Sequence, residues 1–243
     1  MDIVRERYEP PLAPERNFFI ADRGIQRLLA DDCPADLFRL FLIRYSAHGV
    51  RMTEPVESWI QRAGDRCSEL GHEDLGRALR SHARSEGGHE KLMENDARLL
   101  VEQWNARHAA HLDAERLLTS SPLYSTRKYA QLHEDVITGP RPYCQIAIEY
   151  EIERLSVIIG PAVVAKCATQ LGDSGFSFLA EHVELDKGHT AFNERQLRLL
   201  LEQDDAALVP LVETGRKALR CYLAFLSECI ELADADRLRL GAD

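Results

Sequence analysis

One short pattern occurs twice in this chain, and the two copies begin 100 residues apart. The first copy is His82-Ala-Arg-Ser-Glu-Gly-Gly-His89, and the second is His182-Val-Glu-Leu-Asp-Lys-Gly-His189. Each copy has a histidine at position i, a carboxylate at i+4 and another histidine at i+7. At about 100° per residue, these positions fall within a stripe roughly 60° wide on an α-helix. The pattern therefore predicts two helices that each present two imidazoles and a carboxylate on one face.

Both copies stand in segments with the composition of helices. Residues 73–106 contain no proline, and side chains that would share one face follow at alternating steps of four and three: Leu75, Leu79, His82, Glu86, His89 and Met93. Few stretches alternate polar and apolar residues with the period of two that half-buried strands need. The sequence therefore predicts an all-α bundle of about seven to nine helices.

We expect the chain to form one helical domain after a short arm. Pro10, Pro11 and Pro14 favour an irregular N-terminal arm over residues 1–16. No linker-like stretch divides residues 17–243, which we expect to form a single metal-binding domain.

Charge and hydropathy exclude several classes of partner. The formal net charge of −10 argues against nucleic acid and anionic membranes, because both need a basic surface. No apolar run approaches the roughly 18 residues of a membrane span, and the charged N-terminus has no secretory h-region. The six cysteines form no C-x-x-C pair, which is typical of reduced thiols. We therefore expect a cytoplasmic protein with a small-molecule partner.

The paired stripes have the chemistry of a metal site. Histidine and carboxylate side chains suit iron and manganese. Positions i and i+7 are roughly 10.5 Å apart along a helix axis, which is too far for one ion. Two ions about 3.5–4 Å apart suit such a stripe, because the middle carboxylate can then reach either ion or bridge both. Glu86 with His89, and Asp186 with His189, have the Glu-x-x-His type of spacing used in carboxylate-bridged bundles.

A further carboxylate should come from another buried helix. Glu149, Glu151 and Glu153 stand in a strongly apolar segment that runs from residue 143 to residue 164. Glu149 and Glu153 share one helix face, whereas Glu151 points elsewhere. An ionised carboxylate in such surroundings is costly unless it is paired or metal-bound. We favour Glu149 as the ligand, with Glu153 as the alternative.

Several glycines stand inside these expected helices. Gly87, Gly88 and Gly188 each cost about 1 kcal/mol relative to alanine in a helix. They could permit close helix packing, leave space near the metals for O₂ or substrate, or mark a local irregularity of the helix. Gly160-Pro161 interrupts the apolar segment late in its course.

At these residues the sequence resembles the haem-oxygenase-like diiron oxidases and oxygenases. They share an all-α bundle with the thiamin-salvage and pyrroloquinoline-quinone-synthesis enzymes. The resemblance covers about residues 20–230, but its specific content is the ligand set. His182, Asp186 and His189 look like the most distinctive element of this family.

The resemblance also implies the rest of a set of three histidines and three carboxylates. In the family a buried upstream helix provides one carboxylate, which fits Glu149, and the first ligand helix provides a carboxylate and a histidine, here Glu86 and His89. His82 is an additional histidine beyond this set. Some members of the family have a carboxylate at that position, so this chain departs from their pattern there. Either His82 binds metal and Glu86 bridges or supports it, or Glu86 binds metal and His82 supports it.

The function that the resemblance implies is a non-haem diiron enzyme that activates O₂ between two Fe²⁺ ions, with manganese as an alternative metal. It would oxidise a small organic substrate, amino-acid-like or fatty-acid-like, in specialised metabolism by N-oxygenation, desaturation or C–C cleavage. The fold does not select among these outcomes. Tyr150, Arg154 and Arg195 are candidates for holding a substrate carboxylate, although a structural role is commoner for such residues.

Two other functions fit an all-α chain of this kind. One is an oxidase of the same fold that uses no cofactor, or that degrades haem with one axial histidine, but neither explains two ligand stripes. The other is a non-catalytic metal-binding helical protein, which would bind metal without consuming O₂. If the chain associates at all, a homodimer is the commonest outcome.

Overall fold

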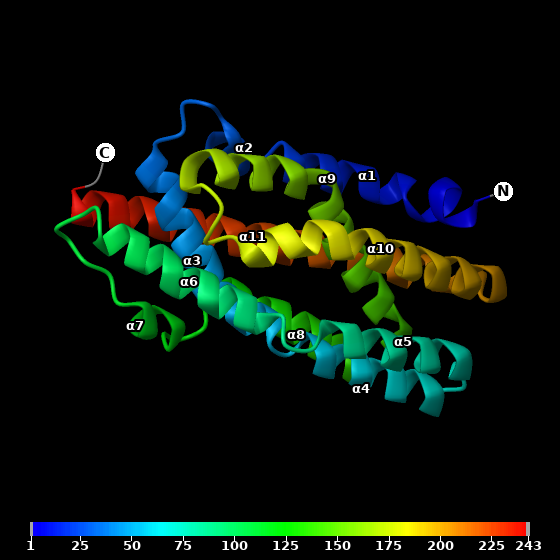
Figure 1. Cartoon of the computed structure of the whole chain (residues 1–243). Coiled ribbons are helices and arrows are strands. Elements are labelled where there is room, and N and C mark those ends of the chain that lie inside the picture. The colour runs from blue at the N-terminus through cyan, green and yellow to red at the C-terminus, as the bar shows by residue number, and fades with distance from the viewer. Residues whose placement is uncertain (1, 242–243) are drawn as a thin grey trace.

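The computed structural model describes residues 2–241, and within that range every regular element is helical (Figure 1). Nine of the described α-helices have eight residues or more, and two are shorter. This arrangement confirms the predicted all-α bundle. The bounds are α1 (Ala13–Ile20), α2 (Arg23–Leu29), α3 (Ala35–Thr53), α4 (Val56–Glu69), α5 (Glu73–Glu86), α6 (Glu90–Asn105), α7 (Ala114–Leu118), α8 (Tyr124–Thr138), α9 (Gln145–Leu171), α10 (Ser177–Gln203) and α11 (Leu208–Leu240).

The N-terminal arm differs from the irregular segment expected over residues 1–16. A π-helical turn (Val4–Tyr8) and a 3₁₀ turn (Pro10–Leu12) lead directly into α1. Apolar side chains at every fourth position, Val4, Tyr8 and Leu12, are fully buried. The prolines are compatible with these turns because they stand in first-turn positions, where the missing N–H has no helical partner to lose.

A buried ion pair fastens this arm to α9. Two guanidinium nitrogens of Arg16, Nε and Nη2, each donate to an oxygen of the Glu151 carboxylate at 2.7 Å. Both side chains are shielded from solvent. Removing one partner of such a pair typically costs 3–5 kcal/mol, because the other charge stays buried and unpaired. Glu151 therefore has a structural role, in keeping with its orientation away from Glu149 and Glu153.

The long helices of the bundle pack against one another in pairs. α9 packs against both α10 and α11, and α3 packs against α6 and α11. Pro161 lies inside α9, and Figure 1 shows that helix bent, so the expected interruption there is a bend and not an end. A Cβ at Gly160 would lie 2.5 Å from Cγ2 of Val183, so glycine at this position lets α9 approach α10 closely.

The first ligand segment does not lie on one continuous helix, contrary to the expectation for residues 73–106. α5 ends at Glu86, Gly87 has an extended ψ of 130°, and Gly88 has a φ of +90°. A φ in that region favours glycine, since a Cβ would clash with the backbone. α6 then begins after His89. The second segment differs, because α10 continues unbroken through Gly188.

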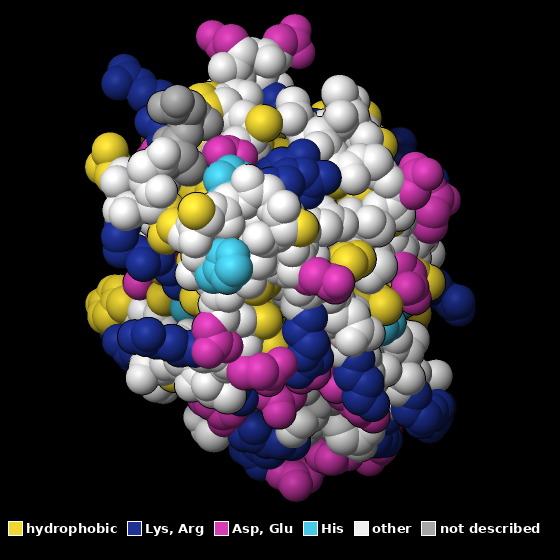
Figure 2. All heavy atoms as spheres, turned by 60° about the vertical axis from the view of Figure 1, so that its left-hand side comes forward, with side chains coloured by type: hydrophobic (Ala, Val, Ile, Leu, Met, Phe, Trp, Pro, Cys, Tyr) yellow, Lys and Arg dark blue, Asp and Glu magenta, His cyan; other side chains and the backbone are white. Residues whose placement is uncertain are grey.

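The surface is mixed in charge. On the face seen in Figure 2, acidic and basic side chains lie interspersed and hydrophobic side chains form separate small patches. Among the described residues, no helix is long and apolar enough to cross a membrane. All six cysteines are free thiols, and five of them are buried.

Candidate metal centre

The predicted ligands come from four helices that meet in the middle of the bundle. α5 provides His82 and Glu86 from its last two turns, and His89 stands at the start of α6. α9 provides the glutamates, and α10 provides the histidine–aspartate–histidine triad. The side chains form two groups whose potential ligand atoms all lie within 4.8 Å of one another: His82, Glu86, Glu153 and His189 in the first group, and Glu86, His89 and His182 in the second.

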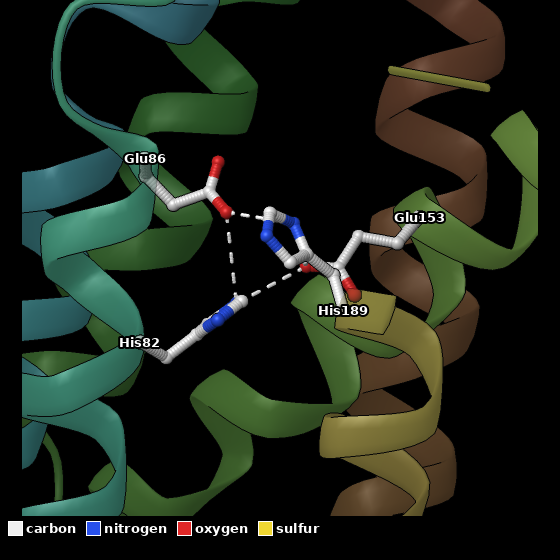
Figure 3. Close-up of side chains that lie close together, drawn as sticks. All are labelled: His82, Glu86, Glu153 and His189. Carbon is white, nitrogen blue, oxygen red and sulfur yellow. Dashed lines mark hydrogen bonds and ion pairs between the residues drawn. The ribbon is translucent and has the colours of Figure 1, made fainter. Parts of the chain in front are cut away.

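The first group joins α5, α9 and α10 (Figure 3). His82 Nε2 lies 3.2 Å from Glu153 Oε1 and 3.7 Å from Glu86 Oε1. His189 Nδ1 lies 3.0 Å from the same Glu86 oxygen. These side chains point toward a common centre from three directions, which is the arrangement that a metal ion requires of its ligands.

The second group shares Glu86 with the first. His89 Nδ1 lies 3.5 Å from Glu86 Oε2, and the ring centroids of His89 and His182 are 4.7 Å apart. Glu86 therefore directs Oε1 toward the first group and Oε2 toward the second. A carboxylate between two sets of ligands is the geometry of a bridge between two metal ions.

Asp186 and Glu149 lie beside these groups, in different ways. Asp186 Oδ1 is 3.6 Å from His189 Nδ1, and its side chain is buried. Glu149 is also buried, but its carboxylate accepts a 2.5 Å hydrogen bond from Gln145 Nε2 and belongs to neither group. The structure thus brings Glu153 into the cluster in place of the favoured Glu149. One turn of α9 separates them on the same face, so periodicity could not rank them.

The donor atoms of the cluster fit a metal ion. Glu86 Oε1, His89 Nδ1 and His189 Nδ1 are all buried, and within residues 2–241 none of them makes an aligned hydrogen bond, although Glu86 lies within ion-pair distance of both histidines. Metal ions would use all three atoms as ligands. His182 Nδ1 donates to the Phe178 carbonyl at 2.8 Å, which leaves Nε2 free to bind metal.

The pKa shifts of the acidic groups in and beside the cluster also favour bound cations. Burial, and then the nearby carboxylates of Glu153 and Glu86, raise the pKa of Glu149 to about 8. Burial and Asp186 raise the pKa of Glu153 well above its usual range. Burial alone would lower the pKa of His189, but Asp186 and Glu86 raise it to about 10. In the metal-free protein, bound protons therefore reduce the repulsion between these acidic groups. Divalent cations could take the place of those protons.

Two supporting contacts were not identified from the sequence. Asn193 is fully buried, and its Nδ2 donates to Glu153 Oε2 at 2.7 Å. Asn193 continues the steps of four and three along the α10 stripe, so extending the pattern by one turn would have found it. Gln145 Nε2 also lies 2.8 Å from Nδ1 of the buried His133, which connects Glu149 to α8. No periodic pattern signals that second contact.

A cavity adjoins the cluster. Its lining residues at the cluster are Glu86, Glu149, Glu153, His182 and Asp186. The rest of the wall is mostly apolar. A largely apolar cavity with a few convergent polar groups is the usual form of a small-molecule site.

The candidates for a substrate carboxylate lie outside the metal cluster, and two of them already have a partner. Arg154 and the Tyr150 hydroxyl both donate to the Glu9 carboxylate of the N-terminal arm. Arg195 is exposed on α10 and lies outside the cavity wall. The first two residues therefore help to attach the arm, which is the structural role that is commoner for such side chains.

Comparison with known proteins identifies the fold. No family model and no curated protein matches the sequence. A crystal structure of a domain of unknown function with a haem oxygenase-like fold, from Shewanella denitrificans OS217, matches with a TM-score of 0.74 at 16% identity. The match covers 100% of this chain and 97% of that chain. The chain therefore has the haem-oxygenase-like fold that the sequence predicts.

Proposed function

We propose that this protein is a non-haem diiron enzyme that uses O₂ to oxidise a small organic molecule. The observation that carries the proposal is the position of Glu86, whose two carboxylate oxygens face two different groups of ligands. In this proposal Glu86 bridges two ions. His82, Glu153 and His189 hold one ion, and His89 and His182 hold the other. Both candidates in the first segment, His82 and Glu86, are thus ligands.

The charge of the cluster supports two divalent ions. Two such ions carry a charge of +4, which the four carboxylates in and beside the cluster would balance: Glu86, Glu149, Glu153 and Asp186. Mixed imidazole and carboxylate ligands favour iron, with manganese as an alternative. Bound ferrous ions would supply the redox chemistry that O₂ activation requires.

The side chains around the ligands have separate tasks. The Phe178 carbonyl fixes the His182 tautomer, and Asn193 holds the outer oxygen of Glu153. Such outer contacts usually matter about 10–100-fold in metal affinity or activity. The apolar cavity wall keeps water away from the cluster and gives a substrate access to it.

A metal titration tests the proposal. Metal-free protein is mixed anaerobically with Fe²⁺, bound iron is measured after desalting, and O₂ consumption is then followed with candidate substrates. We expect about two irons per chain. His182→Ala should lose O₂ consumption, whereas Glu184→Ala, an exposed site on the same helix, should behave as wild type.

Three outcomes would count against the diiron enzyme. Fewer than one iron per chain would show that the protein has no diiron centre. Undiminished O₂ consumption by His182→Ala would show that the second ligand group takes no part in the chemistry. Tight binding of two irons with no O₂ consumption under any condition would favour a non-catalytic metal-binding protein.

A further inference from the structure

Asp96 is a buried carboxylate on α6 that belongs to neither group of candidate metal ligands. It is only 4% exposed, and the hydrogen bonds that it accepts within residues 2–241 come from the first two residues of α10. Burying a carboxylate is costly unless hydrogen bonds or opposite charge compensate it. A helix N-terminus offers both, through its free N–H groups and the positive end of the helix dipole. The start of α10 therefore stabilises a carboxylate that comes from another helix.

The contacts of Asp96 replace the cap that α10 does not have of its own. Oδ1 of Asp96 accepts hydrogen bonds from the N–H and the hydroxyl of Ser177, both at 2.9 Å. Oδ2 accepts the N–H of Phe178, also at 2.9 Å. The N-cap residue of α10 is Phe176, whose side chain cannot cap, whereas α2 is capped by its own Asp22. The capping bonds of α10 therefore tie that helix to α6.

The turn before α10 is held by the same face of α6. A Cβ at Gly175 would lie 2.9 Å from Cδ2 of Leu100, and the φ of +90° at Gly175 also favours glycine. Nε2 of Gln103 donates to the Ser174 hydroxyl at 3.0 Å. Asp96, Leu100 and Gln103 stand at positions i, i+4 and i+7, so they share one face of α6. The start of α10 thus has a fixed position relative to α6.

Phe178 passes this fixed position on to a candidate metal ligand. Its carbonyl accepts a hydrogen bond from His182 Nδ1 at 2.8 Å. Its ring also stacks on the imidazole of His182, with the centroids 3.8 Å apart and the planes inclined by 27°. The backbone and the side chain of Phe178 therefore both determine how the His182 ring is oriented.

The two histidines of the second ligand group depend on the same helix. His89 stands at the start of α6, and its ring centroid lies 4.7 Å from that of His182. Asp96 follows His89 by seven residues on α6. One helix thus carries one histidine of this group together with the carboxylate that fixes the start of the helix bearing the other.

We propose that Asp96 is a positioning residue for the second ligand group. By holding Phe178 against α6, it keeps His182 in the tautomer with a proton on Nδ1 and leaves Nε2 for a metal ion. The inference rests on the proposed function only for the presence of that ion, because the orientation of His182 is a property of the metal-free chain.

The tautomer of His182 tests this inference without metal or substrate. An asparagine at position 96 has the shape of aspartate, but its amide nitrogen cannot accept a hydrogen bond, so it cannot bind the N–H groups of both Ser177 and Phe178. We expect the ¹⁵N spectrum of metal-free wild type, at about pH 8, to show His182 protonated on Nδ1. Asp96→Asn should show a mixture of both tautomers. The His182 signals are identified by their absence from His182→Ala.

A Co²⁺ titration tests the consequence for metal binding. The second group has three candidate ligands and the first has four, so we expect the ion of the second group to bind more weakly. Asp96→Asn should weaken that second Co²⁺ by about 10–100-fold and leave the first within about twofold of wild type. A change that affects only one ion is not expected from a general loss of stability.

Three further variants separate the contacts of Asp96 and Phe178. Ser177→Ala removes the hydroxyl donor but keeps both backbone bonds to Asp96, so it should change neither the tautomer nor the second Co²⁺. Phe178→Leu removes the stacked ring but keeps its N–H and carbonyl, so the tautomer should stay as in wild type. Asp96→Glu keeps the charge but extends the side chain by one methylene group. It should change both measurements in the same direction as Asp96→Asn, and it decides the question if Asp96→Asn does not fold, as judged by thermal unfolding.

Several results would overturn the inference. An unchanged His182 tautomer in folded Asp96→Asn would show that Asp96 does not position this histidine. Equal weakening of both Co²⁺ ions would leave Asp96 with a general structural role. If Phe178→Leu produced the tautomer mixture and Asp96→Asn did not, stacking would be the cause. If wild type binds fewer than two Co²⁺ ions, the proposed diiron function fails, while the tautomer comparison still decides the role of Asp96.

Discussion

The two ligand segments, residues 82–89 and 182–189, have the same spacing of ligands but different backbones. In the second segment α10 runs through Gly188 without a break. In the first, α5 ends at Glu86 and the chain turns through Gly87 and Gly88 before His89. The spacing i, i+4, i+7 therefore describes one rigid helix face in the second segment and two separate helix ends in the first.

The break changes what the middle carboxylate can reach. Asp186 lies in the interior of a helix and interacts with its own neighbour, His189. Glu86 is the last residue of α5, and its carboxylate lies near His82 of α5, His89 in the turn before α6, and His189 of α10. We infer that a carboxylate at a helix end is better placed to bridge two ions than one held within a continuous helix.

The largest expected effect comes from removing each middle carboxylate in turn. Glu86→Ala should bring bound iron from about two per chain to below one, because in the proposed centre this residue holds both ions. Asp186→Ala should lower iron affinity by about 10–100-fold while retaining at least one ion, because the one ligand histidine within 4.0 Å of the Asp186 carboxylate among the described residues is His189. Iron per chain, measured after anaerobic loading and desalting, gives the comparison.

Glu184→Ala serves as the control, since Glu184 is exposed on α10 and pairs with the equally exposed Lys187. If Glu86→Ala and Asp186→Ala lost iron to the same extent, the two carboxylates would contribute equally to metal binding, and Glu86 would not be distinguished as the bridge. A Glu86→Ala protein that kept two irons would exclude the bridge altogether.

Periodicity predicted the faces of the ligand helices but not the break between α5 and α6. The steps from Leu75 to Met93 look continuous, because the chain restarts as a helix in a phase that returns His89 to the cluster. The information on the break lies in the φ of +90° at Gly88, a backbone property that a count of apolar positions does not contain. Two adjacent glycines are compatible with a break, but they are equally compatible with close helix packing or with space beside the metals.

Long-range contacts explain the other differences. Glu149 and Glu153 share a face of α9, and only the packing of α5 and α10 against one turn of α9 brings Glu153 into the cluster. The Arg16–Glu151 pair joins residues far apart in the chain, so no local pattern indicates it. The fold was predictable because the α10 triad and the helical periodicity are both local features of the sequence.

Two titratable groups at the metal centre, Glu149 on α9 and His189 on α10, predict a pH dependence of the metal-free protein. The raised pKa values of Glu149, about 8, and His189, about 10, mean that the folded chain holds these protons more tightly than the unfolded chain. That stability is present at low pH and is lost as the pH rises, from about 4.5 to 8 for Glu149 and from about 6.5 to 10 for His189. Each proton contributes up to about 1.4 kcal/mol per pH unit.

Urea unfolding at pH 6 and pH 8 measures this effect. His48, His82, His133 and His182 have lowered pKa values, which add stability as the pH rises, so the contribution of Glu149 is isolated by comparison with Glu149→Gln. Relative to Glu149→Gln, the free energy of unfolding of metal-free wild type should fall by about 1–3 kcal/mol between pH 6 and pH 8. Saturating Mn²⁺ should remove this difference, because metal replaces the proton. The same pH response in wild type and Glu149→Gln would contradict the proposed electrostatics.

The smallest expected effects come from adding one methyl group to corresponding glycines of the two segments. Gly188→Ala should be neutral or stabilise by up to about 1 kcal/mol, because a Cβ there meets nothing within 4 Å and alanine favours a helix. Gly88→Ala also meets no neighbouring atom, but its φ of +90° should cost about 1–2 kcal/mol. Urea unfolding of both variants, with and without Mn²⁺, measures the difference. Since His89 and Glu86 flank the turn at Gly88, this variant should also bind Mn²⁺ more weakly, whereas Gly188→Ala should bind it as wild type does. Equal behaviour of the two alanine variants would mean that the break at residues 87–88 has no part in forming the site.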